Sequence, residues 1–160
     1  MEYLLCTNGL TKQYGRHKAV DSVNIHIRQG DIYGLIGRNG AGKTTILKII
    51  SGLASPTAGD FTLFGKTGKN VSPYMSRIGT LIEAPGVYPN MSARENLKLK
   101  CLAMGVRKKG CIDDLLRIVG LENTGRKKIR NFSLGMIQRL GIALALVGDP
   151  DIVILDEPIN

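Results

Sequence analysis

The sequence has few of the features that mark membrane-spanning or secreted proteins. Its longest apolar run, residues 140–147, contains a glycine and is far shorter than the roughly 20 residues that cross a bilayer. The first ten residues, MEYLLCTNGL, do not begin with basic residues followed by a long apolar stretch, so we expect no signal peptide. Any association with a membrane should therefore depend on a partner protein.

Cysteine and aromatic residues are also scarce. The three cysteines, Cys6, Cys101 and Cys111, show neither metal-ligand nor redox spacing, so we expect free thiols in a reducing compartment. No aromatic residue lies within the basic clusters at 107–109 and 126–130, which argues against a stacking platform for single-stranded nucleic acid. The net charge of +9 favours a solvated basic surface, with nucleic acid, anionic lipid or a phosphate ligand as alternatives.

The composition and the order of elements predict one α/β domain. The chain has 160 residues, of which 43% are hydrophobic and 22% charged, as is typical of a globular domain. Residues 1–36 are expected to be rich in β-structure. Strands are expected at 23–27, 32–36, 61–65, 77–83 and 151–155, helices at 44–53, 93–104, 111–119 and 133–148, and irregular segments at 55–60, 65–73 and 120–132. This alternation predicts a mostly parallel sheet flanked by helices, with an antiparallel β piece at the N-terminus and a helical subdomain.

The stretch GRNGAGKT at residues 37–44 fits the phosphate-loop pattern G-x-x-x-x-G-K-[ST] and lies between an expected strand and an expected helix. Glycines let successive backbone N–H groups curl around one anion, and the N-terminus of the helix adds a positive end. Lys43 should reach the β- and γ-phosphates, Thr44 should offer its hydroxyl to Mg²⁺, and Thr45 should support the α-phosphate. The residues expected to contact nucleotide are Gly37, Asn39, Gly40, Ala41, Gly42, Lys43, Thr44 and Thr45. A glycine-rich structural turn is the alternative.

A pair of carboxylates, Asp156 and Glu157, follows the apolar stretch at residues 151–155, which is expected to be a fully buried strand. In a parallel sheet, ligands lie at the carboxyl ends of the strands. Asp156 should therefore hold Mg²⁺, directly or through water, and Glu157 should face the γ-phosphate and polarise the attacking water. The alternative is a strand followed by an acidic turn.

Three motifs in one order resemble the ATPases of ABC transporters. FSLGMIQR at 132–139 resembles their signature motif, and it lies between GRNGAGKTT and ILDEP as in that family. The segment at 10–24 resembles the family's opening segment, in which an aromatic residue stacks on adenine, and Tyr14 occupies the matching position. The resemblance implies ATP and Mg²⁺ as cofactors. It also implies a head-to-tail pair of ATP-binding subunits, in which Ser133 and Gly135 close over the ATP of the partner.

Two departures from the family pattern concern the site. The signature has Leu134 where glycine is usual and Met136 where glutamine is usual. Glu83 follows the expected strand at 77–83, where most of the family has glutamine, and residues 77–97 resemble the branch of bacitracin and lantibiotic exporters. A glutamate can ligate Mg²⁺, but it adds negative charge beside the phosphates. We therefore expect a slow resting turnover.

The resemblance implies an ATP-binding and ATP-hydrolysing subunit that powers export of a peptide antibiotic or similar compound through a separate polytopic membrane subunit. The residues expected to act on the γ-phosphate are Lys43, Thr44, Glu83, Asp156 and Glu157. Residues 84–105 are the candidate coupling surface. The subunit should be cytoplasmic and peripheral on the inner face of the cell membrane, with no nucleic acid as partner. Alternatives are a nucleotide-binding module without turnover and a soluble ABC ATPase that acts on nucleic acid.

The resemblance also implies that the chain is an incomplete ABC-type domain, made of parts at 1–83, 84–132 and 133–160. In the family, a Gly-Leu-Asp segment, a helix, a strand and a histidine that contacts the γ-phosphate follow the Asp-Glu pair. His17 and His26 lie too early in the chain to be that histidine. The implied strand would lie between those at 32–36 and 151–155, and buried backbone groups left without it would each cost on the order of 1–3 kcal/mol. We therefore expect the 160 residues alone to fold poorly or associate, and to hydrolyse ATP weakly.

Overall fold

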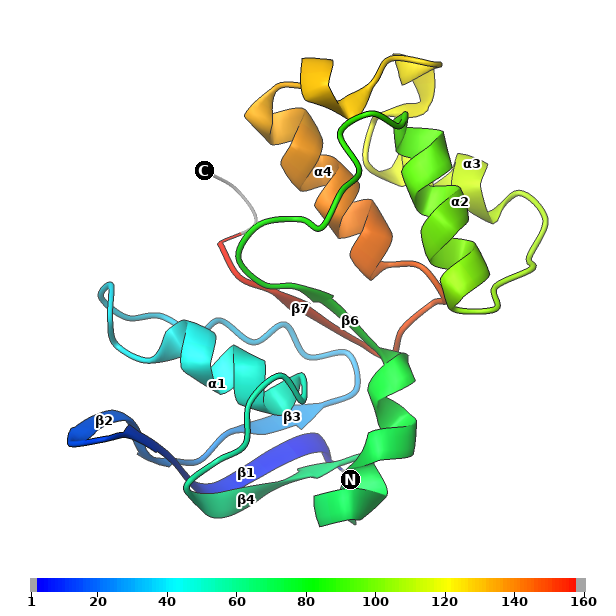
Figure 1. The fold of residues 1–160 in the computed structure, drawn as a ribbon. Coiled ribbons are helices and arrows are strands. Elements are labelled where there is room, and N and C mark those ends of the chain that lie inside the picture. The colour runs from blue at the N-terminus through cyan, green and yellow to red at the C-terminus, as the bar shows by residue number, and fades with distance from the viewer. Residues whose placement is uncertain (1–2, 158–160) are drawn as a thin grey trace. The chain divides into compact units, whose positions relative to one another are not determined.

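The computed structural model describes residues 3–157, so the last residues of the DEPIN stretch, 158–160, lie outside the described residues. Contacts divide the chain into two compact units, Met1–Ser76 and Arg77–Asn160. The first unit contains β1 (Tyr3–Tyr14), β2 (His17–Val23), β3 (His26–Arg28), α1 (Lys43–Ile50), β4 (Ala58–Leu63), β5 (Lys66–Thr67) and the 3₁₀ helix η1 (Gly68–Arg77) (Figure 1). The second contains β6 (Ile78–Leu81), α2 (Ala93–Ala103), α3 (Cys111–Ile118), η2 (Glu122–Thr124), η3 (Ile129–Asn131), α4 (Leu134–Ala145) and β7 (Ile152–Leu155).

The first unit is built on an antiparallel sheet centred on β1. This long strand pairs with β2, β3 and β4, all antiparallel, and β5 continues the sheet beyond β4. Leu5 and Leu10 of β1 and Leu63 of β4 are fully buried, as expected for a sheet with one face against a core. Ile46, Ile49 and Ile50 of α1 are also buried. The predicted N-terminal antiparallel piece is therefore confirmed.

The apolar stretch at residues 32–36, predicted to be a strand, is irregular. The side chains of Ile32 and Ile36 are fully exposed, at 103% and 97%. A strand needs backbone partners on a neighbouring strand, and none of the strands described for this unit pairs with the stretch. The prediction was wrong because an apolar pattern does not itself provide the neighbour. Residues 65–73, predicted as loop, instead contain β5 and the start of η1.

The second unit holds the parallel part of the fold. Strands β6 and β7 pair in parallel, with Ile78 opposite Ile152 and Leu81 opposite Leu155. Both strands were predicted. The expectation that β7 is fully buried was wrong, because Val153 is 39% exposed. Helix α4 packs against β6. Among the described strands, β7 pairs only with β6, so the other edge of β7 has no strand partner there.

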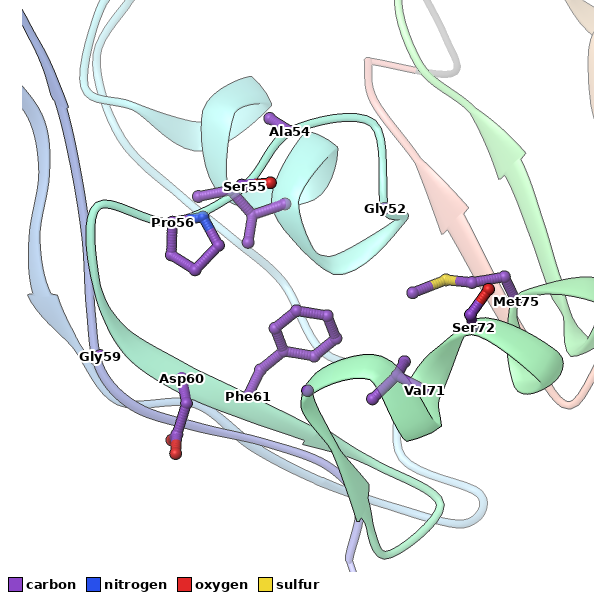
Figure 2. A pocket seen from close by; sticks show the side chains of 12 residues that line it. Gly52, Ala54, Ser55, Pro56, Gly59, Asp60, Phe61, Val71, Ser72 and Met75 are labelled. Atoms are coloured by element: carbon purple, nitrogen blue, oxygen red, sulfur yellow. The ribbon is translucent and has the colours of Figure 1, made fainter.

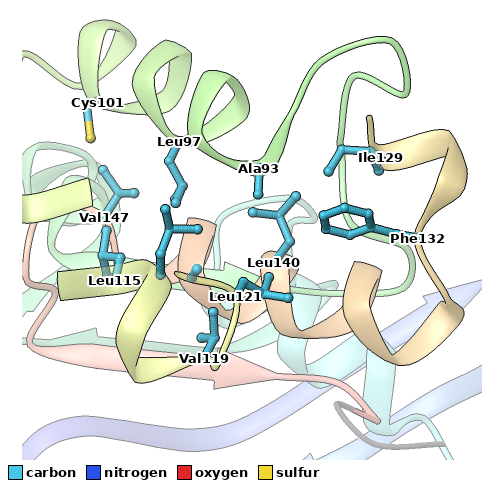
Figure 3. Packing of buried hydrophobic residues seen from close by; sticks show 12 residues of the cluster. Ala93, Leu97, Cys101, Leu115, Val119, Leu121, Ile129, Phe132, Leu140 and Val147 are labelled. Atoms are coloured by element: carbon cyan, nitrogen blue, oxygen red, sulfur yellow. The ribbon is translucent and has the colours of Figure 1, made fainter. Parts of the chain in front are cut away.

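Helices α2, α3 and α4 enclose the core of the second unit. Figure 3 shows Leu97 of α2, Leu115 of α3 and Leu140 of α4 pointing into one cluster. Helix α2 begins at the predicted capping box, in which the Ser92 backbone N–H donates to Glu95 Oε2 at 2.6 Å. The three cysteines are free thiols, as predicted. Within residues 3–157, no helix combines the length and the apolar character needed to cross a bilayer.

Two glycines let α4 lie unusually close to β6 and the segment after it. A Cβ built on Gly79 of β6 would lie 2.0 Å from the carbonyl oxygen of Ala145. A Cβ built on Gly141 of α4 would lie 2.7 Å from Cγ of Pro85. Separations this short are below van der Waals contact, so the observed packing requires glycine at both positions. This packing sets the distance between α4 and the Glu83 segment.

Candidate functional site

The predicted phosphate loop lies at the N-terminus of α1, as the sequence predicted. Gly42 is the residue before the helix and has φ 86°, and Gly40 has φ 80°. Both values lie in the left-handed region that favours glycine. A Cβ on Gly42 would also lie 2.1 Å from the carbonyl oxygen of Ala19 in β2. Gly42 is therefore needed both for the turn and for the contact between loop and sheet.

Lys43 lies inside this loop. Its Nζ donates to the carbonyl oxygen of Gly37 at 2.8 Å and to that of Arg38 at 3.1 Å. Phosphate oxygens would compete with these carbonyls for the same ammonium group, and no acidic residue lies in the first turn of α1. The structure thus brings together in one loop the residues predicted to contact the phosphates of the nucleotide. They are Gly37, Asn39, Gly40, Ala41, Gly42, Lys43, Thr44 and Thr45. The loop and the helix N-terminus suit a polyphosphate anion.

Tyr14 lies on the hairpin that contacts the phosphate loop. It ends β1, faces His17 across the β1–β2 turn and is 52% exposed. The same hairpin carries Ala19, whose carbonyl oxygen approaches Gly42. An exposed aromatic ring therefore lies on the element that packs against the loop, which is compatible with its predicted role beside a base. That role stays a prediction.

The structure also brings the predicted carboxylates to one edge of the β6–β7 pair. Glu83 follows β6, and Asp156 and Glu157 follow β7. The Asp156 backbone N–H donates to the carbonyl oxygen of Leu81 at 2.8 Å, so the two parallel strands end at the same level. Glu83 has φ 63° and Glu157 has φ 45°, a conformation that costs a non-glycine residue roughly 1–2 kcal/mol. Strain of this kind is often found at functional sites.

These donors fit magnesium held together with phosphate. Within the described part of the chain, no three His, Cys, Asp or Glu side chains gather into a group that could hold a metal alone. Mg²⁺ commonly uses one or two carboxylates together with water and substrate phosphates. The Asp156 carboxylate and the Thr44 hydroxyl are oxygen donors of the required kind. Because they lie in different units, their meeting at one ion stays a prediction, as does the role of Glu83 as a ligand.

Ser133 and Gly135 lie at the N-terminus of α4. Ser133 is the N-cap, and its hydroxyl oxygen accepts from the Met136 backbone N–H at 3.3 Å. Leu134 is exposed, and a Cβ on Gly135 would meet nothing within 4 Å. The capping role is therefore present, and the open surroundings would admit a second molecule. Binding of a partner's ATP by these residues stays a prediction.

Sequence reasoning missed Lys12. Its Nζ lies 5.0 Å from the centroid of the Tyr14 ring and donates to the carbonyl oxygen of Ser55 at 2.7 Å. The sequence could have indicated the contact between Lys12 and Tyr14, because residues two apart on a strand project from the same face. The partner Ser55, distant in sequence, carried no such signal.

The described pocket of the first unit is separate from the phosphate loop and the carboxylates, although Ser55, whose carbonyl oxygen accepts from Lys12, lies in its lining. It has a volume of about 450 Å³ and lies between the end of α1, β4 and η1, where Figure 2 shows Phe61, Val71 and Met75. Its lining residues are Ile49, Gly52, Ala54, Ser55, Pro56, Gly59, Asp60, Phe61, Gly68, Val71, Ser72 and Met75. None of them is a predicted site residue, so this pocket does not contribute to the candidate site.

The glycine loop on α1 and the carboxylates after parallel strands define a nucleotide-binding domain of the P-loop class. The profile of the ABC transporter family matches residues 20–160, and the chain belongs to this family. The resemblance inferred from the motifs is thereby confirmed.

Two named relatives are similar to this chain over almost its whole length. The chain is 50% identical over 161 residues to the bacitracin transport ATP-binding protein BcrA of Bacillus licheniformis, covering 100% of this chain and 53% of that protein. It is 43% identical over 157 residues to the lantibiotic transport ATP-binding protein SrtF of Streptococcus pyogenes, covering 98% and 67%. The chain thus spans about half the length of the bacitracin transport protein.

Solved structures confirm the fold class. An ATP-binding subunit of an ABC transporter has a TM-score of 0.84 and 30% identity, with 98% of this chain and 67% of that chain covered. An ATP-binding cassette solved as a dimer in a post-hydrolysis state with ADP and Pi has a TM-score of 0.83 and 26% identity, with coverage of 96% and 74%. The predicted α/β P-loop fold is therefore confirmed.

Proposed function

We propose that this chain is the ATP-binding and ATP-hydrolysing part of an ABC transporter subunit. The observation that carries the proposal is the loop around Lys43, which caps α1 with left-handed glycines and surrounds an ammonium group with loop carbonyls. The carboxylates at the shared edge of β6 and β7 supply the second half of an ATPase site. Membership of the ABC transporter family supports this combination.

The proposed roles follow from the chemistry of each side chain. Lys43 binds the β- and γ-phosphates and balances their charge, while the N–H groups at the start of α1 orient them. Thr44 and Asp156 supply oxygen ligands for Mg²⁺, which when bound neutralises charge that develops on the phosphates. Glu157 accepts a hydrogen bond from the attacking water and orients it. Glu83, at the same edge, lies beside that water and slows resting turnover through its charge.

The transport role and the partners are part of this proposal. Relatives are named as bacitracin and lantibiotic transport ATP-binding proteins, which favours export of a peptide antibiotic or similar compound through a separate polytopic membrane subunit. A related cassette was solved as a dimer, which supports a head-to-tail pair in which Ser133 and Gly135 cover the partner's ATP. Such a subunit would be cytoplasmic and peripheral on the inner face of the membrane.

The test measures ATP affinity and phosphate release in the full protein. Lys43→Ala is expected to weaken ATP binding at least tenfold, because the charge that faces the phosphates is removed. Lys66→Ala, which removes an exposed lysine from β5, is the matched control and should change neither quantity. Unchanged affinity in Lys43→Ala would contradict the proposal.

The carboxylates are tested separately. Glu157→Gln should preserve ATP binding and reduce turnover by roughly 10²-fold or more, the usual contribution of a group that handles the proton of the nucleophile. Glu83→Gln should raise the resting rate. If Glu83→Gln changes neither the rate nor the dependence on Mg²⁺, the role of Glu83 is refuted. ATP binding without phosphate release in the wild-type protein would favour the alternative of a binding module.

A further inference from the structure

The side chain of Lys12 joins two parts of the first unit. Its ammonium lies over the ring of Tyr14, 5.0 Å from the centroid. The same ammonium donates a 2.7 Å hydrogen bond to the carbonyl oxygen of Ser55. Ser55 belongs to the segment that leaves the C-terminal end of α1, the helix whose N-terminus carries the phosphate loop. One cation therefore contacts both the aromatic ring and the segment that follows the phosphate helix.

Backbone contacts hold the same two segments in register. The Thr57 backbone N–H donates to the carbonyl oxygen of Thr11 at 2.8 Å, and the Gln13 backbone N–H donates to the Thr57 hydroxyl at 3.0 Å. These bonds flank Lys12 on both sides. The Lys12 ammonium thus has a defined acceptor on a backbone that is itself held in place, which limits the positions available to the ring beneath it.

Tyr14 needs such support because little else restrains its ring. The residue ends β1 at the tip of a hairpin and is 52% exposed. An exposed side chain on a strand end samples several rotamers, and ordering it on binding costs conformational entropy. A cation over one face of an aromatic ring favours a single orientation and leaves the opposite face for another planar group.

We propose that Lys12 is a positioning residue for recognition of the base, holding the Tyr14 ring in the orientation that receives adenine. The inference rests on the proposed function, since it assumes that Tyr14 stacks on the base. It predicts separate roles for two lysines of the first unit. Lys12 acts on the base through Tyr14, whereas Lys43 acts on the phosphates.

The experiment compares ATP with inorganic tripolyphosphate, which carries the same phosphate chain without a base. Dissociation constants for both ligands are measured by titration calorimetry on the full protein and its variants. Lys12→Met removes the charge but keeps much of the aliphatic stem, and Lys12→Arg keeps a cation. Lys18→Met is the matched control, because Lys18 lies on the same hairpin but pairs with Asp21 at 3.1 Å.

Lys12→Met should weaken ATP binding about two- to five-fold, the range that corresponds to an exposed cation–π contact. It should leave tripolyphosphate binding unchanged, Lys12→Arg should restore ATP affinity, and Lys18→Met should resemble the wild type. Equal losses for both ligands, or no loss for either, would overturn the proposal.

Failure of the proposed function would give different results in the same titrations. If the wild-type protein binds neither ligand, the assignment of the phosphate loop is wrong. If Tyr14→Ala leaves the ratio of the two affinities unchanged, Tyr14 does not contact the base and the role of Lys12 is overturned with it. If Tyr14→Ala changes that ratio and Lys12→Met does not, only the inference about Lys12 is overturned.

Discussion

Replacing Gly79 by alanine isolates the close packing of α4 on β6. Gly79 has an ordinary backbone conformation, outside the left-handed region, so alanine is not strained there for local reasons. The added Cβ, however, would lie 2.0 Å from the carbonyl oxygen of Ala145 and 3.0 Å from Cγ of Pro150. Neither atom belongs to a flexible side chain, so either the strand or the end of the helix must move.

The expected cost follows from this overlap. Real Cβ contacts below 3.0 Å are essentially absent, so the separation from Ala145 must increase by about 1 Å or more. Overpacking of this kind typically lowers the free energy of unfolding by roughly 1–3 kcal/mol. A urea m-value of about 2 kcal/mol/M for a domain of this size then converts the loss to a shift of roughly 0.5–1.5 M in the unfolding midpoint.

Urea unfolding of the full protein, followed by circular dichroism, measures this shift. Gly86→Ala is the matched control, since Gly86 lies in the same unit, has no left-handed backbone and has open space around its Cβ position. The control should unfold within a few tenths of a molar of the wild type. If the midpoint of Gly79→Ala moves no further than that of Gly86→Ala, the packing of α4 on β6 is not as close as described.

Three further predictions concern the loop, a helix cap and the carboxylates. Gly42→Ala should weaken ATP binding more than tenfold, measured by calorimetry, because it combines left-handed backbone strain with overlap between the added Cβ and the carbonyl oxygen of Ala19. The control is Gly30→Ala, which has the same backbone strain at φ 85° but open space around its Cβ position. This variant should bind ATP normally. The Ser92 backbone N–H and hydroxyl, together with Lys128, lower the pKa of Glu95 to about 2 from 4.5. Stability from this carboxylate is therefore fully present above about pH 4.5 and is lost as the pH falls toward 2. Glu95→Gln should flatten the dependence of the urea midpoint between pH 6 and pH 3, and an unchanged slope would contradict this reasoning. Glu157→Gly should abolish phosphate release while the urea midpoint stays equal or rises, since glycine relieves its left-handed backbone; a midpoint loss as large as that of Gly79→Ala would refute it.

Features that depend on neighbours in sequence were predictable. The start of α2 follows from a serine and a glutamate three residues apart, whose side chains satisfy each other's backbone N–H groups. The start of α1 follows from the glycines before Lys43, which supply the left-handed turn into the helix. Strands β6 and β7 follow from short apolar runs that lead into Glu83 and Asp156. In each case the signal and the structure lie within a few residues.

Features that depend on a distant partner were not predictable. Residues 32–36 carry a strong apolar pattern, but a strand also requires backbone groups from a neighbouring strand, and none is present among the strands described. The exposure of Val153 has the same origin, because it depends on what lies beside β7. The contact of Lys12 with Ser55 joins residues 43 positions apart. A local pattern cannot specify any of these.

The backbone at the two glutamates is strained, and burial of their side chains does not offset this strain. Glu83 and Glu157 leave their strands with φ 63° and φ 45°, and both are exposed, so neither side chain gains burial in return. Glycine adopts this conformation without the cost of roughly 1–2 kcal/mol that a larger residue incurs. Backbone conformation alone would therefore favour glycine at both positions. Carboxylates held there at that cost, at the shared end of two parallel strands, fit the roles that we propose for them beside a metal and a polyphosphate.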